Sequence, residues 1–450
     1  MMTKIKTLAA AVAAIAASNG YAQGFYVDEQ SAIRLGDAFS AGAAAISDAS
    51  VAAYNPAAML ATREELAINL SAISVQSEFK GDATTGVGTT AIQGDKAEAD
   101  NFDLLPTLYY VNHLDNTLAF GAFINAPYAT GTDFGDNSVA RYAVTESEIT
   151  GIDAGASFAF QLTESTSMGL SVIAQYMNAK MATAINTTAL CLGELDASTC
   201  ANLGVDPAEL GNNTHDGLFV LEGNNVAFGF TAGALTQFDH GGRLGINYRS
   251  RVVHDLKGSA AVSFSDSAAG FTSLAGLENT SARGSVQITT PESANLSYSQ
   301  EFGNLTLQSD VQWTKWSRFD QLNIESRNST VAMLTAEPQQ HQWRESFRFA
   351  LGANYRLSEQ LTVRTGMALD RTPIGDKNAK IDFAFADYRA ISLGMTYEIS
   401  DGLDLDAGYQ HTLQQNRDID QNELTSTGSR LNGEVTTDVN SFALGLRWAL

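Results

Sequence analysis

The chain has 450 residues, of which 44% are hydrophobic and 17% are charged, and its formal net charge is −23 at pH 7. Such a charge repels phosphate, so nucleic acid is excluded as a partner. The apolar content is too high for a disordered chain, and no linker divides the sequence into separate soluble domains.

The first predicted element is a secretory signal peptide over residues 1–22. Two lysines precede an apolar run from Leu8 to Ala17, and small residues follow, so we expect cleavage after Ala22. The run is shorter than the roughly 20 residues that a membrane-spanning helix needs. No longer apolar run follows. We therefore expect an exported chain without a transmembrane helix.

Residues 23–62 form the second predicted element. They are rich in Ala, Gly and Ser and show no strand period, so we expect a compact segment that is not part of a sheet. The segment carries five large apolar side chains: Phe25, Ile33, Leu35, Phe39 and Ile46. They are candidate contacts for a hydrophobic ligand or, equally, packing contacts with the rest of the chain.

Residues 63–450 follow an alternating pattern with about ten residues per segment. In the last segment, Phe442, Leu444 and Leu446 alternate with small or polar residues. Short polar turns alternate with long irregular connections, which is typical of an outer-membrane barrel. The pattern predicts an all-β fold, a transmembrane antiparallel β-barrel of about 14 strands. The alternative is a soluble β-sandwich or propeller.

A barrel of this width encloses a lumen that its own strand side chains cannot fill. It is therefore either an aqueous pore or plugged. We interpret residues 23–62 as a hatch that plugs the lumen, and residues 63–450 as the barrel.

The two cysteines, Cys191 and Cys200, lie close together in a polar segment. A disulfide within one loop is favoured over a metal site, because the exported compartment is oxidising and no other ligand pair is near. The sequence contains no nucleophile elbow, phosphate loop or zinc-protease motif, and we expect neither a cofactor nor an enzymatic activity. A lipase with a Ser-His pair brought together only by folding is the alternative.

The sequence GFYVDEQSAIRLGDAFSAG at residues 24–42, followed by Asn55, Pro56 and Ala57, resembles the N-terminal hatch of the FadL family. This family comprises outer-membrane transporters of long-chain fatty acids, with relatives that carry aromatic hydrocarbons. The segment from Trp313 to Phe319 is similar to the family's tryptophan signature. The family's Pro-Asp element before its twelfth strand is missing, and residues 385–389 stand in its place.

The resemblance implies passive transport: capture on the outer loops, a lumenal apolar pocket, hatch movement and exit through a gap in the wall. Four residues resemble the end of the family's kinked third strand, where the gap is expected: Ala126, Pro127, Tyr128 and Gly131. Pro127 supplies a cause, since proline donates no ladder hydrogen bond. The Asn55-Pro56 turn is expected to lean on this gap.

Further site residues follow from the same resemblance. Arg344 and then Lys180 are the candidate partners of a fatty-acid carboxylate, or they form lumenal salt bridges. Trp313 and Trp316 either line the ligand path or lie in the aromatic girdle at the membrane interface, and we favour the girdle.

The expected partners are a long-chain fatty acid or similar hydrophobic molecule, outer-membrane lipid and the barrel assembly machinery. The chain ends in Trp448-Ala449-Leu450, which resembles the assembly signal of such barrels, although that signal more often ends in Phe. We expect a monomer in the bacterial outer membrane. A channel for aromatic hydrocarbons is the first alternative, and a general diffusion porin is the second.

Overall fold

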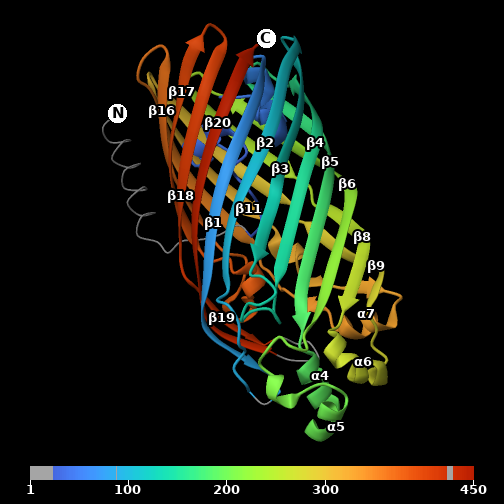
Figure 1. Cartoon of the computed structure of the whole chain (residues 1–450). Coiled ribbons are helices and arrows are strands. Elements are labelled where there is room, and N and C mark those ends of the chain that lie inside the picture. Colours follow the sequence, from blue (N-terminus) through green and yellow to red (C-terminus); the bar gives the residue numbers. More distant parts are fainter. Residues whose placement is uncertain (1–23, 88, 423–428) are drawn as a thin grey trace.

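The computed structural model describes residues 24–87, 89–422 and 429–450, so the predicted signal peptide lies outside the described residues. The chain forms a closed antiparallel β-barrel of fourteen strands (Figure 1). The wall segments are β1 (Glu65–Thr85), β2 (Glu98–Asp115), β3 (Leu118–Asp133), β4 (Glu146–Gln161), β5 (Thr166–Ile185), β6 (Gly217–Gln237), β7 (Gly242–Arg249), β8 (Val252–Ser263), β9 (Thr280–Thr290), β10 (Ser293–Phe302), β11 (Leu305–Thr314), β15 (Ser346–Arg356), β16 (Leu361–Asp370), β17 (Tyr388–Ser400), β18 (Leu403–Gln414) and β20 (Ser429–Ala449).

Closure comes from β1, which pairs with β2 on one side and with β20 on the other. Two wall strands are each broken into halves. β7 and β8 are separated at Ser250 and Arg251, and β9 and β10 at Pro291 and Glu292. Proline at such a break is expected, because it cannot donate to a ladder. The fourteen strands match the number predicted from the alternating segments.

Side-chain alternation gives the wall an apolar outside. On β20, Phe442 is 55% exposed and Leu444 is 61% exposed, whereas Ala443 and Arg447 between and beyond them are buried. So many exposed large apolar side chains would favour aggregation in water but suit a lipid environment. Among the described residues, no helix has both the length and the apolar character needed to cross a membrane.

The connections differ between the two ends of the barrel. One end, called here the turn end, has short turns and the C-terminus, whereas the loop end carries the long connections (Figure 1). The helices of these long connections are α4 (Thr187–Glu194), α5 (Ala197–Asn202), η2 (Pro207–Glu209), η3 (Asp266–Ala268), α6 (Ala269–Ala275), η4 (Trp316–Arg318), α7 (Ser329–Leu334), η5 (Asp376–Asn378) and η6 (Ile381–Phe383). Their short strands are β12 (Gln321–Leu322), β13 (Ile324–Ser326), β14 (Gln339–Gln340) and β19 (Arg417–Asn422).

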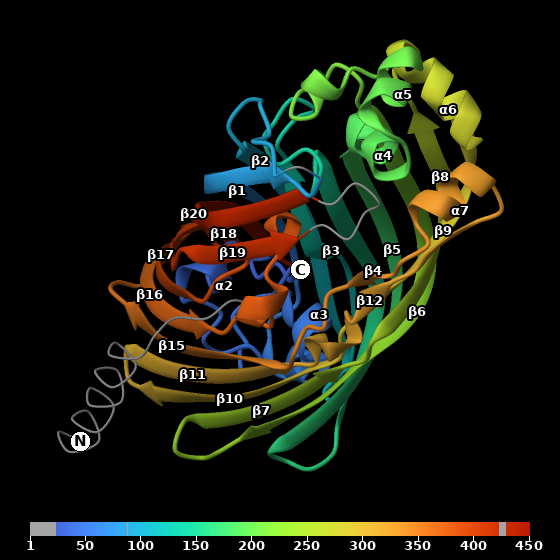
Figure 2. The same ribbon diagram turned by 90° about the horizontal axis from the view of Figure 1, so that it is seen from below.

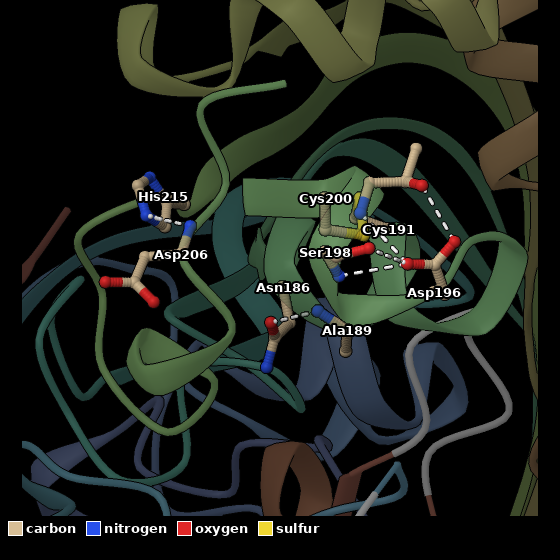
Figure 3. The surroundings of a disulfide bond; sticks show 9 residues. Asn186, Ala189, Cys191, Asp196, Ser198, Cys200, Asp206 and His215 are labelled. Atoms are coloured by element: carbon tan, nitrogen blue, oxygen red, sulfur yellow. Dashed lines mark hydrogen bonds between the residues drawn. A yellow bond between two sulfur atoms is a disulfide. The ribbon is translucent and has the colours of Figure 1, made fainter. Parts of the chain in front are cut away.

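The longest of these connections is braced by the disulfide between Cys191 of α4 and Cys200 of α5, whose Cα atoms are 5.9 Å apart (Figure 3). The side chain of Asp196 caps α5 by accepting hydrogen bonds from the backbone N–H groups of Ser198 and Thr199. Asp196 also accepts hydrogen bonds from the hydroxyl groups of Ser198 and Thr199, and these, together with the backbone N–H groups, hold its pKa well below its usual range. The loop disulfide expected from the sequence is therefore present.

Residues 24–62, called here the lumenal segment, lie inside the barrel (Figure 2). They form α2 (Ala32–Gly36), α3 (Val51–Tyr54) and η1 (Pro56–Ala61). Small residues let this segment approach the wall closely. A Cβ atom on Gly36 would lie 2.7 Å from the Cα atom of Gly394 in β17, so only glycine fits there. The Ala and Gly content of the segment is thus a packing requirement.

Candidate functional site

The wall has a gap between β2 and β3. Their ladder stops at the pair Leu108 and Ile124, although β2 extends back to Glu98 and β3 continues to Asp133. On the outer flanks the ladders continue, with β1 paired along β2 and β4 paired along β3. Residues 98–107 of β2 and 125–133 of β3 are therefore two unpaired lips, and we use that name for them below.

Each lip contains a proline, Pro106 in β2 and Pro127 in β3. The register between β3 and β4 also shifts between Asn125 and Tyr128, which marks a bulge. Proline donates no backbone hydrogen bond, so both lips are poorly suited to a continuous ladder. The β2–β3 ladder thus ends close to Pro127, where the sequence analysis expects a gap, and Pro106 is a second signal that the sequence analysis missed.

The lumenal segment takes up the hydrogen bonds that β3 does not make with β2. The backbone N–H of Val27 donates to the carbonyl oxygen of Pro127 at 2.9 Å, and that of Ala129 donates to the oxygen of Phe25 at 3.1 Å. Tyr26 forms an antiparallel bridge with Tyr128. Residues 25–27 thus pair with the β3 lip in place of the neighbouring wall strand.

Gln30 connects both lips. Its amide accepts a hydrogen bond from the backbone N–H of Ala126 at 2.9 Å and donates to the Ala126 oxygen at 2.8 Å. Its own carbonyl oxygen accepts from the hydroxyl groups of Thr107, at 2.9 Å, and Tyr109, at 3.1 Å, both on β2. Further along the gap, the side chain of Asn101 donates to the Gly131 oxygen. Nothing in the local sequence around Gln30 indicated this role.

A cavity of about 200 Å³ lies directly behind the gap. It is bounded by both lips, by Gly24 and residues 26–29 of the lumenal segment, by five residues between 381 and 388, and by β1, β18 and β20, whereas Phe25 is not part of its lining. Its apolar lining includes Ile73, Val75, Leu105, Phe385 and Val439. An apolar chamber that meets an unpaired stretch of wall can hold a hydrophobic guest next to the lipid.

The charged lining of the cavity is acidic. Asp28, Glu29, Asp103 and Asp382 contribute to it, and none of the described lining residues is a lysine or an arginine. Burial and the neighbouring Asp28 raise the pKa of Glu29, which accepts a hydrogen bond from Ser441 at 2.9 Å. Burial likewise raises the pKa of Asp382. The cavity therefore disfavours an additional negative charge.

An aromatic cluster surrounds Phe25, which is 1% exposed. Its ring centroid lies 4.7 Å from that of Trp316, 5.5 Å from Phe319 and 5.8 Å from Trp343. Tyr128 is also in contact with it, at 5.9 Å. The girdle position expected for Trp316 is thus wrong, because its indole is fully buried in the lumen.

Trp313 is placed differently from Trp316. It follows the register of the exposed Val311 on β11 and so faces outward, in agreement with the girdle interpretation. The two tryptophans differ because Trp313 lies within the wall strand, whereas Trp316 belongs to η4, after the strand has ended.

The other apolar residues predicted for the ligand contact lie away from the cavity. Ile33 is buried, and Leu35 and Phe39 pack near Ala443 of β20. Ile46 packs against a separate apolar cluster that includes Met59. None of them lines the 200 Å³ cavity. Their positions correspond to the packing alternative.

The Asn55-Pro56-Ala57 turn lies against β6, so the expectation that it leans on the gap is not met. The Asn55 amide donates to the oxygen of Ala43 at 2.6 Å and to that of Ala234 in β6 at 3.2 Å. Its side-chain oxygen accepts from the N–H of Ala57 and so begins η1. The turn fixes the lumenal segment at a site remote from the two lips.

The two predicted carboxylate partners also lie away from the cavity. Lys180 shares its face of β5 with the exposed Val172 and Tyr176, so it is on the outside of the wall, where it pairs with Glu146 at 2.6 Å. Alternation alone could have shown this. Arg344 is exposed and precedes β15. The lumenal placement of Lys180 is corrected accordingly, whereas the role of Arg344 stays a prediction.

Among the buried lumenal cations are Arg249 and Arg348, which the sequence analysis did not select. Arg348 lies 3.0 Å from Asp28 of the lumenal segment, and Arg249 lies 2.6 Å from Asp153 of β4. Both already have acidic partners. Among the described residues, no group of three or more His, Cys, Asp or Glu side chains is arranged to hold a metal.

Several known proteins are similar to this chain in sequence and in fold. The family model described as "Outer membrane protein transport protein (OMPP1/FadL/TodX)" matches residues 13–449. A long-chain fatty acid transport protein of Escherichia coli O6:H1 is 28% identical, covering 90% of this chain and 91% of the relative. Outer membrane protein P1 of Haemophilus influenzae is 26% identical, with 97% and 95% covered.

Solved structures agree on the fold. A Pseudomonas aeruginosa FadL homologue superposes with a TM-score of 0.84 at 22% identity, covering 95% of this chain and all of that one. The Pseudomonas putida toluene transporter TodX gives a TM-score of 0.65 at 16% identity, with 95% and 100% covered. With the family model matched over nearly the whole sequence, this outer-membrane β-barrel belongs to the OMPP1/FadL/TodX family of transport proteins.

Proposed function

We propose that the protein lets long-chain fatty acids cross the outer membrane passively, without catalysing a reaction. The observation that carries this proposal is the apolar cavity that opens at the unpaired lips of β2 and β3. A ligand in this position can leave sideways into lipid, which a continuous ladder would prevent. Two relatives named long-chain fatty acid transport protein support the substrate class.

The lumenal segment acts as the hatch in this proposal. The direct path along the barrel axis is filled by α2, α3 and η1, which pack against wall strands on opposite sides. The lateral path is closed by residues 25–30, through the hydrogen bonds to the two lips, and by the hydrogen bond from Asn101 to Gly131. Displacing this short stretch frees the β3 lip and opens the cavity toward the membrane.

Phe25 supplies the switch between the two states. Its ring fills an aromatic cluster that would also accommodate an acyl chain. Burial of a phenylalanine side chain contributes roughly 2–3 kcal/mol, and each buried CH₂ group contributes about 0.8 kcal/mol. About four methylene groups therefore match the ring, so a long acyl chain can replace Phe25 whereas a short one cannot.

A channel for neutral aromatic hydrocarbons is the second candidate, and the acidic lining of the cavity favours it. An ionised carboxylate next to Asp28, Glu29 and Asp103 would be repelled, whereas toluene or a protonated fatty acid would not. Structural neighbours include a toluene transporter and a monoaromatic hydrocarbon channel.

The function is tested by uptake of labelled oleate and labelled toluene in cells that lack other such channels, with and without this protein. Uptake of oleate that depends on the protein supports the first candidate, and dependence for toluene alone supports the second. If neither compound depends on the protein, the transport proposal fails.

The lateral route is tested by closing the gap. Cysteines introduced by Asn101→Cys and Gly131→Cys lie on opposite lips, where the two native residues are in hydrogen-bond contact. We expect cross-linking with a short bifunctional reagent to stop uptake. The matched control is Thr150→Cys with Asn178→Cys, a register pair across the continuous β4–β5 ladder, where cross-linking should leave uptake unchanged. Equal uptake in both cross-linked proteins would exclude the lateral route.

A further inference from the structure

A second, much larger cavity lies at the loop end, where α7 stands beside β8 and β9 (Figure 2). Its volume is about 990 Å³. Its charged lining consists of Lys257 on β8, Arg283 on β9, Arg327 before α7 and Glu325 on β13. It has no contact with the cavity behind the gap, since the two share no lining residue.

The cavity opens on the outside of the barrel. Lys257 has the same register on β8 as Val253, which is 43% exposed, while Leu256 between them is buried in the lumen. Arg283 is exposed and alternates with the buried Gly284 on β9. The cationic side chains therefore project away from the lumen, on the face of the wall that meets the membrane.

The position of the cavity relative to the apolar belt fixes what surrounds it. The large apolar side chains that are exposed on the outer face end at Val226 on β6 and at Val253 on β8, while Leu218 and Val220, further toward the loop end, are half-buried. The next outward residues toward the loop end are polar, and Asn224 pairs in register with Lys257. Four residues of strand separate Val253 from Lys257, a rise of about 13 Å. The cavity thus lies at the height of lipid head groups, directly above the region of the acyl chains.

The charge of the site is opposite to that of the protein. The chain has 50 acidic and 27 basic residues, yet three cations meet here with one acid. Lys257, Arg283 and Arg327 form no ion pair with any residue that the structure describes. By contrast, Lys80, Lys96 and Lys180 each contact a glutamate. Three cations that line one opening without an acidic partner offer a positively charged site to an anion.

We propose that this cavity binds the phosphate groups of an anionic outer-leaflet lipid, whose acyl chains lie along the apolar belt below. The cations match phosphate in charge, and arginine matches it in geometry. Val253 and Val226, one to two turns of the pleat below the cavity on the same outer face, supply the apolar surface that a free anion does not need. The site is independent of the transport route, because it lies on the opposite side of the wall from the lumen.

The proposal is tested with purified full-length protein in a nonionic detergent, titrated with lipid A that carries both phosphates and followed by native mass spectrometry. The triple variant Lys257→Ala, Arg283→Ala, Arg327→Ala should bind about a hundredfold more weakly, since each cation near a charged membrane surface contributes roughly a fivefold factor. The control variant Lys80→Ala, Lys96→Ala, Lys180→Ala changes the net charge equally but removes cations that already have partners, and should bind as the wild type does.

Two further measurements keep the test decisive. Glu325→Gln removes the acid from the site and should tighten binding about fivefold. Lipid A without phosphates should bind as weakly as the triple variant, and inorganic phosphate at the same concentration should not compete. The proposal is overturned if the triple variant keeps its affinity, if its control loses as much, if phosphate-free lipid A binds equally, or if inorganic phosphate displaces the lipid. Uptake of oleate or toluene should be unchanged in the triple variant, which separates this result from the transport proposal.

Discussion

The two ends of the lumenal segment are held by different chemistry. Residues 25–30 are held by aromatic contacts of Phe25 and by hydrogen bonds to the two lips. Residues 43–62 are held by polar anchors, among them the Ser157 hydroxyl, which donates to the Ala52 oxygen at 2.7 Å, and the Asn55 amide. An apolar ligand can compete for the place of the Phe25 ring, although displacement of this end must also break its hydrogen bonds to the lips. The second end presents no such ring next to the aromatic cluster, so we expect the first end to move while the second stays in place.

The fixed end adjoins a buried ionic network. Arg447 of β20 lies 2.6 Å from Asp406, 2.9 Å from Asp404 and 3.3 Å from Glu65, where the lumenal segment joins β1. Glu65 also accepts a hydrogen bond from the N–H of Ala49 at 2.6 Å. The network thus ties the segment to both closing strands of the barrel.

The strongest test removes one end or the whole of the segment. We expect deletion of residues 23–62 to raise ion conductance sharply in planar bilayers, because the lumen loses the elements that fill it. Deletion of residues 24–29 alone should leave conductance near the wild-type level, because α2, α3 and η1 remain. If the short deletion conducts as well as the long one, the fixed end does not close the lumen.

Arg447→Ala is expected to have the next largest effect. It leaves Asp406 without its salt-bridge partner and leaves Glu65 and Asp404 paired only with the exposed Arg63, and it should lower the free energy of unfolding by about 3–5 kcal/mol. Denaturant unfolding in lipid vesicles measures this loss. The control is Arg430→Ala, which removes the exposed pair with Asp420 and should change stability by roughly 1 kcal/mol or less. Similar losses in both variants would contradict the anchoring role of Arg447.

Phe25→Ala should act on the movable end. An empty aromatic cluster needs no displacement, so we expect fatty-acid affinity to increase about tenfold, which corresponds to about 1.4 kcal/mol. Trp316 and Trp343 line the cluster, so quenching of tryptophan fluorescence by a brominated fatty acid reports binding there. Phe39→Ala, away from the cavity, serves as the control and should leave affinity unchanged. Weaker binding in Phe25→Ala than in this control would contradict the switch.

The smallest expected effect concerns pH. Burial raises the pKa of Asp37 from 3.8 to about 6, although Arg364 and Arg34 oppose the shift. The folded segment therefore favours the neutral carboxyl: its stabilisation is complete below about pH 4 and is lost as the pH rises to about 6. Asp37→Asn should remove this dependence and change the thermal midpoint at pH 7 by roughly 2–4 °C. A variant whose midpoint keeps the wild-type pH dependence would assign the effect to another group.

The wall could be predicted from the sequence because alternation is local. The small residues on either side of Phe442 and Leu444 indicate that these two side chains face the lipid. Pro127 indicates a break in strand pairing because proline has no backbone N–H to donate. The prediction that Lys180 lies in the lumen is wrong, although Lys180 and Val172 are an even number of residues apart and so share the outer face of β5. The prediction came from resemblance to the family, which does not indicate the face of the strand. The sequence alone therefore predicts the barrel and the position of the break in its wall.

The site itself was less accessible, because it joins distant segments. Phe25, Trp316, Trp343 and Phe383 come from the lumenal segment and from separate loops, so no spacing along the chain connects them. The cavity depends in addition on where the β2–β3 ladder stops, which is a property of strand register. Local sequence patterns predict neither the contacts between these distant aromatic residues nor the point at which the β2–β3 ladder ends.

Gln30 has a consequence for how the wall parts. Its side chain completes the backbone pairing of Ala126, while its main-chain oxygen receives Thr107 from the facing strand. Withdrawal of Gln30 removes one connection from each margin at once, while residues 25–27 still pair with β3 and Asn101 still contacts Gly131. Loss of the Gln30 contacts therefore weakens both edges of the gap in the same step.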